Sequence, residues 1–311
     1  MGELRSLYCK EINKQNMQNK NRNLPYKKAQ KNNTVSEAKK KNFPSIQTNL
    51  SRKRLSNLEM PKECLEVLLG TLLGDGSLKI NKNYKNARFS MRHAERFYSY
   101  FKWKVDKLKS LASYNAVHLQ QVSKGSDGKT PINEVKRYRF QTLTKEVLTK
   151  LHSIVTVKNR LKIQRSWLNH LTPLSLMCWW LDDGSLIGNG RKGIICTDSF
   201  SRSEVEILRK YLQVVWKIET TVSIRKIKEK SNRNIEERMV FRLSISTTPL
   251  KDFLRIFLQY IPTKEMIYKV CLLYNDYELQ QRWISELKSN LPQFSSEIDK
   301  FYSEKLKKPF L

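Results

Sequence analysis

The chain has 311 residues, of which 59 are Lys or Arg and 29 are Asp or Glu, so its formal net charge is +30. This length suggests two domains or one domain built from two halves, and so one-sided a charge points to a polyanionic partner, most often nucleic acid. The five cysteines form no Cys-x-x-Cys pair and no apolar run is long enough to span a bilayer, which argues against zinc fingers and a membrane protein.

Residues 1–58 differ in composition from the rest of the chain. The first 60 residues hold 14 Lys and Arg against four acidic residues, and segments such as KKAQKNN and KKKNF show no apolar periodicity. Such a composition cannot bury enough apolar surface to offset the entropy of ordering. We predict a basic, disordered arm that either contacts phosphate or acts as an organellar transit peptide.

The first folded half is predicted over 59–165. Pro61 suits the first turn of a helix, and PKECLEVLLGTLLG is apolar on most sides, which indicates a buried helix ending at Gly74-Asp75-Gly76. The patterns that follow predict strands at 77–81 and 88–92, a helix over 94–111, strands at 117–122 and 134–143, and a helix over 145–155.

The same order recurs in a second half, predicted over 166–280. LTPLSLMCWWLDDGSLIG opens with Thr172 as helix N-cap and Pro173 in the first turn, and its helix ends at Asp182-Asp183-Gly184. Strands near 186 and at 194–197, a helix over 201–216, strands at 221–228 and 238–246, and a helix over 249–261 follow, before a helical tail at 281–311. Asp-Gly-Ser-Leu occurs at 75–78 and again 108 residues later at 183–186, so the halves are predicted to be a duplicated unit with pseudo-two-fold symmetry.

The acidic ends of the two motif helices suggest a metal site. Asp is disfavoured at the C-terminal end of a helix, which carries partial negative charge. Gly70 and Gly74 are four residues apart and permit close approach of a partner helix, which would bring Asp75 beside Asp183. Carboxylate and carbonyl oxygens suit Mg²⁺ or Mn²⁺, so Asp75, Asp183 and the Gly74 carbonyl are the candidate ligands, with Asp182 as the other claimant in the second copy. Two such acids beside a basic surface indicate metal-assisted phosphodiester hydrolysis on both strands of a duplex.

These two segments carry a family resemblance. LLGTLLGDG at 68–76 and LMCWWLDDG at 176–184 resemble the two copies of the LAGLIDADG motif, and the chain is similar to a single-chain, two-motif LAGLIDADG homing endonuclease over roughly 60–275. The resemblance implies an α+β fold of two pseudo-symmetric αββαββα halves, with the motif helices at their interface and a saddle-shaped DNA-binding surface. It implies that Asp75 and Asp183 bind the catalytic metal. It also implies a basic residue in each half, Lys269 in IPTKEMIYKV and either Lys158 or, as our choice, Lys162 in VKNRLKIQ.

Polar residues at alternating strand positions are the candidates for DNA contact. A two-stranded β-ribbon fits the major groove, where Arg, Lys, Asn and Gln read base edges. The residues with suitable alternation are Ser77, Lys79, Asn81, Arg88, Ser90, Arg92, Arg137, Arg139, Gln141, Arg225, Lys228, Arg242 and Ser244.

The resemblance implies a double-strand break in a long asymmetric DNA target, made by a monomer and promoting group I intron mobility in a mitochondrion or chloroplast. A maturase that binds its host intron RNA, with or without nuclease activity, is the alternative. A transcription regulator on the same scaffold would be expected to carry a further DNA-binding domain. GSDGKT at 125–130 resembles a P-loop but lacks its first glycine. The four histidines, His93, His118, His152 and His170, have no metal-ligand spacing and are expected at the surface or in the groove.

Overall fold

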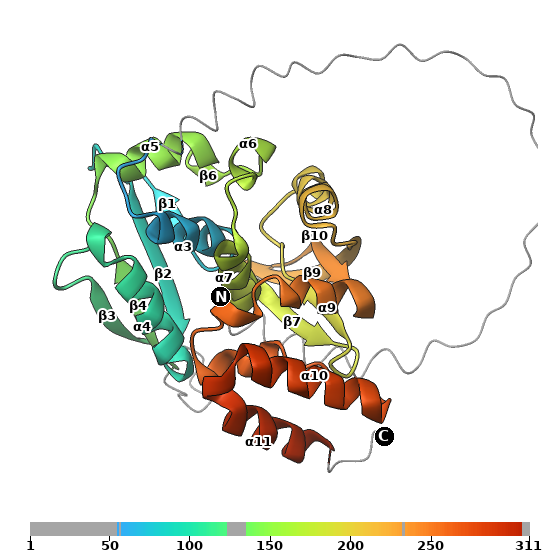
Figure 1. The fold of residues 1–311 in the computed structure, drawn as a ribbon. Coiled ribbons are helices and arrows are strands. Elements are labelled where there is room, and N and C mark those ends of the chain that lie inside the picture. Colours follow the sequence, from blue (N-terminus) through green and yellow to red (C-terminus); the bar gives the residue numbers. More distant parts are fainter. Residues whose placement is uncertain (1–54, 56, 123–134, 232–233, 307–311) are drawn as a thin grey trace, which may run out of the picture. The chain divides into compact units, whose positions relative to one another are not determined.

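The structure is a computed structural model that describes residue 55 and residues 57–122, 135–231 and 234–306 (Figure 1). Nearly all of the predicted arm over 1–58 and the P-loop-like segment at 125–130 lie outside the described residues. Within the described residues, every helix is too short or too polar to cross a bilayer.

The first half contains the predicted elements in the predicted order. It consists of α3 (Lys62–Leu73), β1 (Ser77–Lys79), β2 (Arg88–Ala94), α4 (Tyr98–Lys107), β3 (Val117–Val122), β4 (Val135–Gln141) and α5 (Glu146–Val155). Short 3₁₀ turns at Glu95–Phe97 and Lys109–Leu111 flank α4, so the helix predicted over 94–111 is regular only in its centre.

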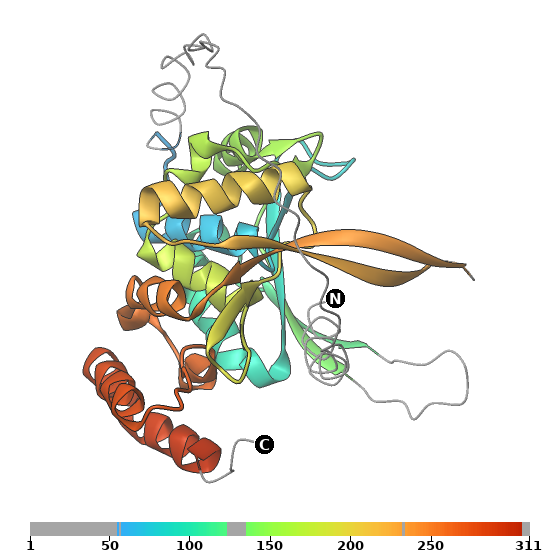
Figure 2. The same cartoon turned by 90° about the vertical axis from the view of Figure 1, so that its right-hand side faces the viewer.

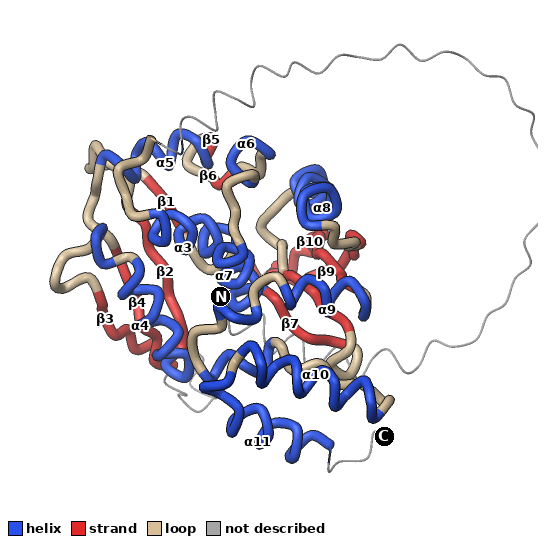
Figure 3. Tube along the Cα trace, viewed as in Figure 1, coloured by secondary structure: helices blue, strands red, loops and turns tan. Residues whose placement is uncertain are grey.

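The second half repeats this order and its sheet topology. It consists of α7 (Pro173–Asp183), β7 (Gly184–Ile187), β8 (Lys192–Ile195), α8 (Arg202–Trp216), β9 (Thr221–Ser231), β10 (Asn234–Ile245) and α9 (Thr247–Arg255). The strand orders β1-β2-β4-β3 and β7-β8-β10-β9 correspond strand for strand, and each sheet lies with its own helices (Figure 3). The predicted α+β fold and its internal duplication are therefore confirmed.

Several short elements were not predicted. The hairpin of β5 (Thr156–Val157) and β6 (Arg160–Leu161) and the helix α6 (Arg165–Leu168) join the halves, and 3₁₀ turns at Leu258–Tyr260 and Lys264–Lys269 follow α9. The chain continues with α10 (Tyr277–Asn290), a 3₁₀ turn at Pro292–Phe294 and α11 (Ser295–Leu306). The predicted tail is helical, but α10 begins at Tyr277, so the boundary placed at 281 falls inside this helix.

The two motif helices pack directly against each other (Figure 1). Thr172 caps α7 by accepting a hydrogen bond from the Ser175 N–H, and Pro173 occupies the first turn, as predicted. The Ser175 hydroxyl donates to the Glu66 carbonyl of α3 at 2.8 Å. A Cβ at Gly70 would lie 2.2 Å from the Ser175 carbonyl oxygen, so the absence of a side chain at position 70 permits this approach. One glycine suffices, because the position matching Gly70 in α7 is Cys178, which packs against Gly70 itself.

We therefore expect Gly70→Ala to destabilise the protein by about 1–3 kcal/mol through overpacking of the helix interface. Alanine is otherwise the better helix former by about 1 kcal/mol, so the sign of the change reports on packing rather than on propensity. The free energy of unfolding in urea measures the effect, with Lys62→Ala at the exposed start of the same helix as the control. A gain in stability from Gly70→Ala would show that α3 and α7 do not approach this closely.

Candidate catalytic site and nucleic-acid interface

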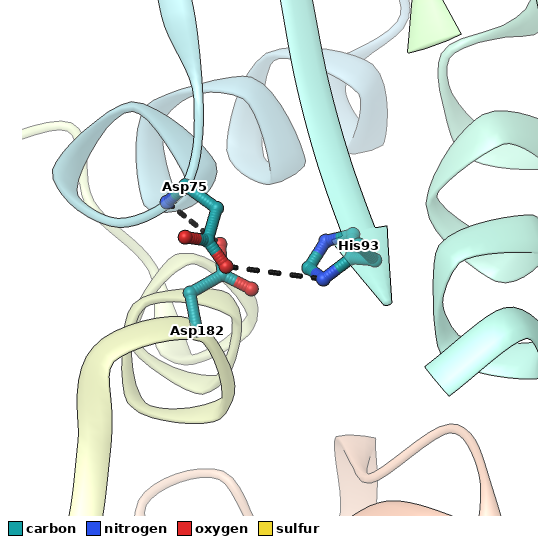
Figure 4. Close-up of side chains that lie close together, drawn as sticks. All are labelled: Asp75, His93 and Asp182. Carbon is teal, nitrogen blue, oxygen red and sulfur yellow. Dashed lines mark hydrogen bonds and ion pairs between the residues drawn. The ribbon is translucent and has the colours of Figure 1, made fainter. Parts of the chain in front are cut away.

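The ends of α3 and α7 bring acids of both motifs together. The backbone N–H of Asp75 donates to Asp182 Oδ2 at 3.4 Å, and a Cβ on Gly74 would lie 2.5 Å from the Asp182 Cβ. Asp182 therefore occupies the space that a side chain at position 74 would need. We expected Asp75 to meet Asp183, yet the second-motif side chain that touches the Asp75 backbone is that of Asp182 (Figure 4).

Asp75 lies at the edge of this group with 28% of its side chain exposed. His93 of β2 faces it, with Nδ1 at 3.8 Å from Asp75 Oδ2 (Figure 4). Burial lowers the pKa of His93 well below its ordinary value, and the nearby ammonium groups of Lys104 and Lys269 lower it further. The expectation that His93 is a surface or groove residue is wrong, because it is buried and neutral beside the acids.

Asp182 is the centre of a buried ion pair. Its side chain and that of Lys104 on α4 are both fully buried, and Lys104 Nζ lies 2.6 Å from Oδ1 and 2.7 Å from Oδ2. The Tyr100 hydroxyl donates to Oδ1 at 3.0 Å. Burial, with the Asp182 carboxylate, raises the pKa of Tyr100 well above its ordinary value, so this hydroxyl keeps its proton.

These contacts use the whole accepting capacity of the Asp182 carboxylate, which is about four lone-pair sites. Oδ1 accepts from Tyr100 and Lys104, and Oδ2 accepts from Lys104 and the Asp75 N–H. The Asp182 carboxylate is thus paired with an ammonium group in this structure, and it is also one of the three residues whose ligand atoms lie close enough together to hold a metal.

Asp183 is the last residue of α7 and is partly buried. Its carbonyl oxygen accepts from the Cys196 N–H at 3.0 Å, which joins the end of the motif helix to the end of β8. The side chain lies close enough to Lys269 to favour the charged form of that lysine.

Lys269 belongs to the 3₁₀ turn at Lys264–Lys269, and its side chain reaches the C-terminal end of α7. Its buried ammonium donates to the carbonyl oxygens of Leu181, at 2.5 Å, and Asp182, at 3.4 Å. Burial lowers the pKa of Lys269, while Asp182, Asp75 and Asp183 oppose this shift. The helix end that seemed an unfavourable place for carboxylates thus receives a lysine from elsewhere in the chain, in accordance with the preference of such ends for cations.

The group of side chains fits a hard divalent cation. Asp75, Asp182 and Asp183 provide three carboxylates against the two buried ammonium groups of Lys104 and Lys269, which leaves one negative charge in excess. Ligand atoms of Asp75, His93 and Asp182 also lie within 4.8 Å of one another. Oxygen donors suit Mg²⁺, and the assignment of Asp75, Asp183 and the Gly74 carbonyl as its ligands stays a prediction.

The first-half lysine candidates lie in and after the hairpin of β5 and β6. Lys158 sits in its turn with φ of 49°. Lys162 directly follows β6, and its Nζ lies 3.3 Å from Glu204 Oε1 at the start of α8. Although burial would raise the pKa of Glu204, hydrogen bonds from Ser201, Ile163 and Lys162 lower it. The Lys162 ammonium thus lies beside an acid at the start of α8, whereas that of Lys269 lies at the end of α7 among the motif acids.

The predicted DNA-contacting residues of the first half share one face of their sheet. Strand register pairs Ser77 with Ser90 and Lys79 with Arg88, and it pairs Arg92 with Arg139. Antiparallel partners point to the same side, and the alternate residues Leu78, Phe89, Met91 and Phe140 are buried on the other. Gln141 and Arg137 belong to the same polar face, whereas Asn81 lies exposed in the loop after β1. His118, which was expected at the surface or in the groove, and Gln120, which we did not predict, join this face from β3 opposite Arg139 and Arg137.

This face is a strongly positive surface. Burial, together with the like charges of Arg92 and Arg88, lowers the pKa of Arg139. The repulsion between these guanidinium groups in the free protein is reduced when a polyanion binds. The face is therefore suited to a phosphate backbone or to base edges in the major groove.

The second sheet fulfils the predictions only in part. Its strands β9 and β10 continue as a long two-stranded ribbon (Figure 2). Arg225 pairs with Val240, and Ser244 pairs with Thr221, on the face opposite the buried Leu243 and Ile245. Lys228 pairs with Glu237 and so belongs to the other face, that of Phe241 and Leu243, which corrects its assignment to the groove.

Arg242 is also corrected. Its guanidinium forms a two-pronged ion pair with Asp198, with Nε to Oδ1 and Nη2 to Oδ2 both at 2.6 Å. The side chain is only 5% exposed, and Arg238 donates to the carbonyl oxygen of the same Asp198. Arg242 therefore holds the end of β8 to β10 rather than reading a base.

Comparisons with known proteins agree with this architecture. The profile of the LAGLIDADG DNA endonuclease family matches residues 65–253. The DNA endonuclease I-ChuI of Chlamydomonas applanata is 26% identical over 176 residues, which cover 53% of this chain and 78% of that protein. The cytochrome b mRNA maturase bI2 of Debaryomyces hansenii is 25% identical over 166 residues, which cover 53% of this chain but only 62% of the maturase. The solved structure of the homing endonuclease I-WcaI bound to its DNA recognition sequence shares the fold, with a TM-score of 0.57 and 21% identity over 73% of this chain and 93% of that one.

Proposed function

The chain belongs to the LAGLIDADG DNA endonuclease family, and from this we propose that it is a site-specific homing endonuclease. It makes a double-strand break in a long asymmetric DNA target by divalent-metal-dependent hydrolysis and so promotes the mobility of a group I intron. The observation that carries this proposal is that ligand atoms of Asp75 and Asp182, from the two motif segments, lie within 4.8 Å of each other and of His93, next to polar sheet faces rich in arginine. The protein acts as a monomer, because both halves of the site are on one chain.

The acids divide into metal ligands and a structural anion. Asp75 and Asp183 hold Mg²⁺ or Mn²⁺, with the Gly74 carbonyl as a further oxygen donor. A metal bound there supplies a nucleophilic water and stabilises negative charge at the phosphate. Lys269, held at the end of α7 among these acids, stabilises the charge that develops on the scissile phosphate or orients the attacking water. Lys162 is the corresponding candidate in the first half, where its ammonium lies 3.3 Å from Glu204 Oε1.

The DNA lies along the polar faces of both sheets. The proposed contacts are those of the residues that register places on these faces or in the exposed loop after β1, namely Ser77, Lys79, Asn81, Arg88, Ser90, Arg92, Arg137, Arg139, Gln141, Arg225 and Ser244. Arginines in this set either contact phosphate, which positions the duplex, or read guanine, which specifies sequence.

We expect Arg139→Gln to weaken duplex binding and to lower its salt dependence. Each phosphate contact contributes a slope of about 0.9 in log K against log salt concentration, so losing one contact lowers the slope by about that amount. Fluorescence anisotropy on a labelled duplex over a range of salt concentrations measures both quantities. Lys150→Gln, at an exposed position on α5, changes the same net charge away from the sheet and serves as the control. Equal affinities and slopes for the two variants would remove Arg139 from the interface.

The decisive test of the function is cleavage-site mapping on randomised duplex libraries with Mg²⁺. We expect a single long site to be cut on both strands, and no cutting when the metal is chelated. A protein that binds RNA tightly but never cuts a duplex of the intronless insertion site would overturn the endonuclease proposal.

A maturase is the second candidate, and similarity to the bI2 maturase favours it specifically. The same scaffold would bind the host intron RNA and assist its splicing, with or without cleavage of DNA. Because that relative matures cytochrome b mRNA, we propose an organelle, mitochondrion or chloroplast, as the place of action in either case. Splicing of the host intron in vitro with and without the protein separates this candidate from an endonuclease alone.

A further inference from the structure

Lys104 is a saturated donor at the junction of the two halves. It lies on α4 of the first half, and its fully buried ammonium contacts Asp182 on α7 of the second half. An ammonium group has three N–H donors and no acceptor. Two of the donors go to Asp182 Oδ1 and Oδ2, at 2.6 and 2.7 Å, and the third reaches His93 Nε2 at 3.3 Å.

The contact with Lys104 determines which nitrogen of His93 carries the proton. Because Lys104 can only donate, His93 Nε2 must accept with its lone pair, and the ring proton is on Nδ1. Nδ1 faces Asp75 Oδ2 at 3.8 Å, which is longer than a hydrogen bond but places the N–H dipole toward the carboxylate. The Asp75 backbone N–H in turn donates to Asp182 Oδ2, so four residues form a closed ring across both motif helices.

We propose that Lys104 and His93 are positioning residues for the Asp75 side of the catalytic site. Lys104 occupies Asp182, so that this acid does not bind metal, and holds His93 in the tautomer whose Nδ1–H orients the Asp75 carboxylate. The inference rests on the proposed role of Asp75 as a metal ligand. His93 of β2 and Lys104 of α4 thus act as outer-shell partners of the metal site. Loss of such partners typically lowers metal affinity by about 10- to 100-fold.

The role of His93 is tested by titrating the full chain with Mn²⁺ alone. The EPR signal of the free ion measures how much Mn²⁺ is bound. The relevant Mn²⁺ site is the one lost in Asp75→Asn. We expect His93→Leu to weaken this site by about tenfold or more. His93→Asn should restore affinity to within about threefold of the original protein, since the Asn amide places an N–H where Nδ1–H stands. Equal affinity in His93→Leu and the original protein would overturn the positioning role.

Pulsed EPR on the bound Mn²⁺ distinguishes positioning from direct ligation. A positioning role predicts no modulation from a coordinated imidazole nitrogen in the original protein. A nitrogen signal that disappears in His93→Asn would make His93 a ligand and overturn the proposal. If Asp75→Asn leaves Mn²⁺ binding intact, the metal-ligand role in the proposed function fails and the positioning role fails with it. Loss in Asp75→Asn with no change in His93→Leu overturns the positioning role alone.

The same titration, applied to Asp182, tests the role of Lys104. We expect Asp182→Asn to change Mn²⁺ affinity by less than about threefold when Lys104 is present. In the Lys104→Met background Asp182 is released, so Asp182→Asn should there weaken Mn²⁺ binding by about tenfold. Thermal unfolding of each variant confirms that the folded protein is being titrated. An equal loss of Mn²⁺ affinity from Asp182→Asn in both backgrounds would make Asp182 an ordinary metal ligand and overturn the role of Lys104.

Discussion

Asp75→Asn should bind the duplex target as well as the original protein does and cut it at least about 10³-fold more slowly. The carboxylate is the partly exposed acid at the junction of the motif helices, and we propose that it holds the catalytic metal. Losing several kcal/mol of metal-derived stabilisation corresponds to three or more powers of ten in rate. Single-turnover cleavage of a labelled duplex, with binding measured separately in Ca²⁺, gives the two quantities. Asp183→Asn should show the same separation of cutting from binding.

Asp106→Asn provides a matched control, because it makes the same chemical change at an exposed position on α4. We expect its cleavage rate to stay within about twofold of the original, in line with the small effects of surface substitutions. Residual cutting of both strands at a normal rate by Asp75→Asn would contradict the assignment of Asp75 to the metal. Loss of binding together with cutting would instead indicate that the acid serves the fold.

The duplicated architecture could be predicted from sequence because local signals repeat. The two motif segments each end in an acid followed by Gly, and each is succeeded by alternating strand patterns in the same order. Such periodicity determines which face of a strand is buried, so the polar residues of β2 and β4 were assigned to the correct side. The hairpin of β5 and β6 escaped prediction because its strands are only two residues long and carry no periodic signal.

The inner composition of the site could not be predicted in the same way, because it depends on contacts between distant segments. Asp182 and Lys104 are 78 residues apart, and nothing local to either residue indicates the other. A signal for Lys104 was nevertheless present. It lies on the buried side of α4 with Tyr100 and Phe101, and a lysine on an apolar stripe requires a buried counter-charge. His93 gives a similar signal, since it continues the inward alternation of Phe89 and Met91 on β2.

The errors in the second sheet have equally physical causes. Arg242 alternates correctly for the groove, but Asp198, in the segment after β8, supplies a carboxylate that holds its guanidinium. A loop acid cannot be matched to a strand arginine without knowing the tertiary fold. Lys228 was misassigned because it lies three residues after Arg225, an odd separation that turns it to the opposite face.

Lys104→Met should destabilise the folded protein by about 3–5 kcal/mol, the cost of removing one member of a buried ion pair. Methionine has about the length of lysine, so the loss is electrostatic rather than a cavity. Among the residues that the structure describes, this leaves the buried Asp182 carboxylate with the Tyr100 hydroxyl and the Asp75 N–H as its donors. The change in the free energy of unfolding, measured in urea without divalent metal, gives the magnitude. Lys102→Met on the exposed side of the same helix is the control and should change stability by less than about 0.5 kcal/mol.

The double variant Lys104→Met with Asp182→Asn identifies the cause of this loss. If the buried unpaired carboxylate is responsible, neutralising it should recover most of the stability, because Asn keeps the shape of Asp182 and still accepts from Tyr100. Mn²⁺ should likewise raise the melting temperature of Lys104→Met more than that of the original protein, since a cation at Asp75 can then also be bound by the released Asp182. A double variant no more stable than Lys104→Met alone would show that the lysine stabilises the helix junction through its aliphatic packing, and would leave the charge of Asp182 to be balanced by Lys269.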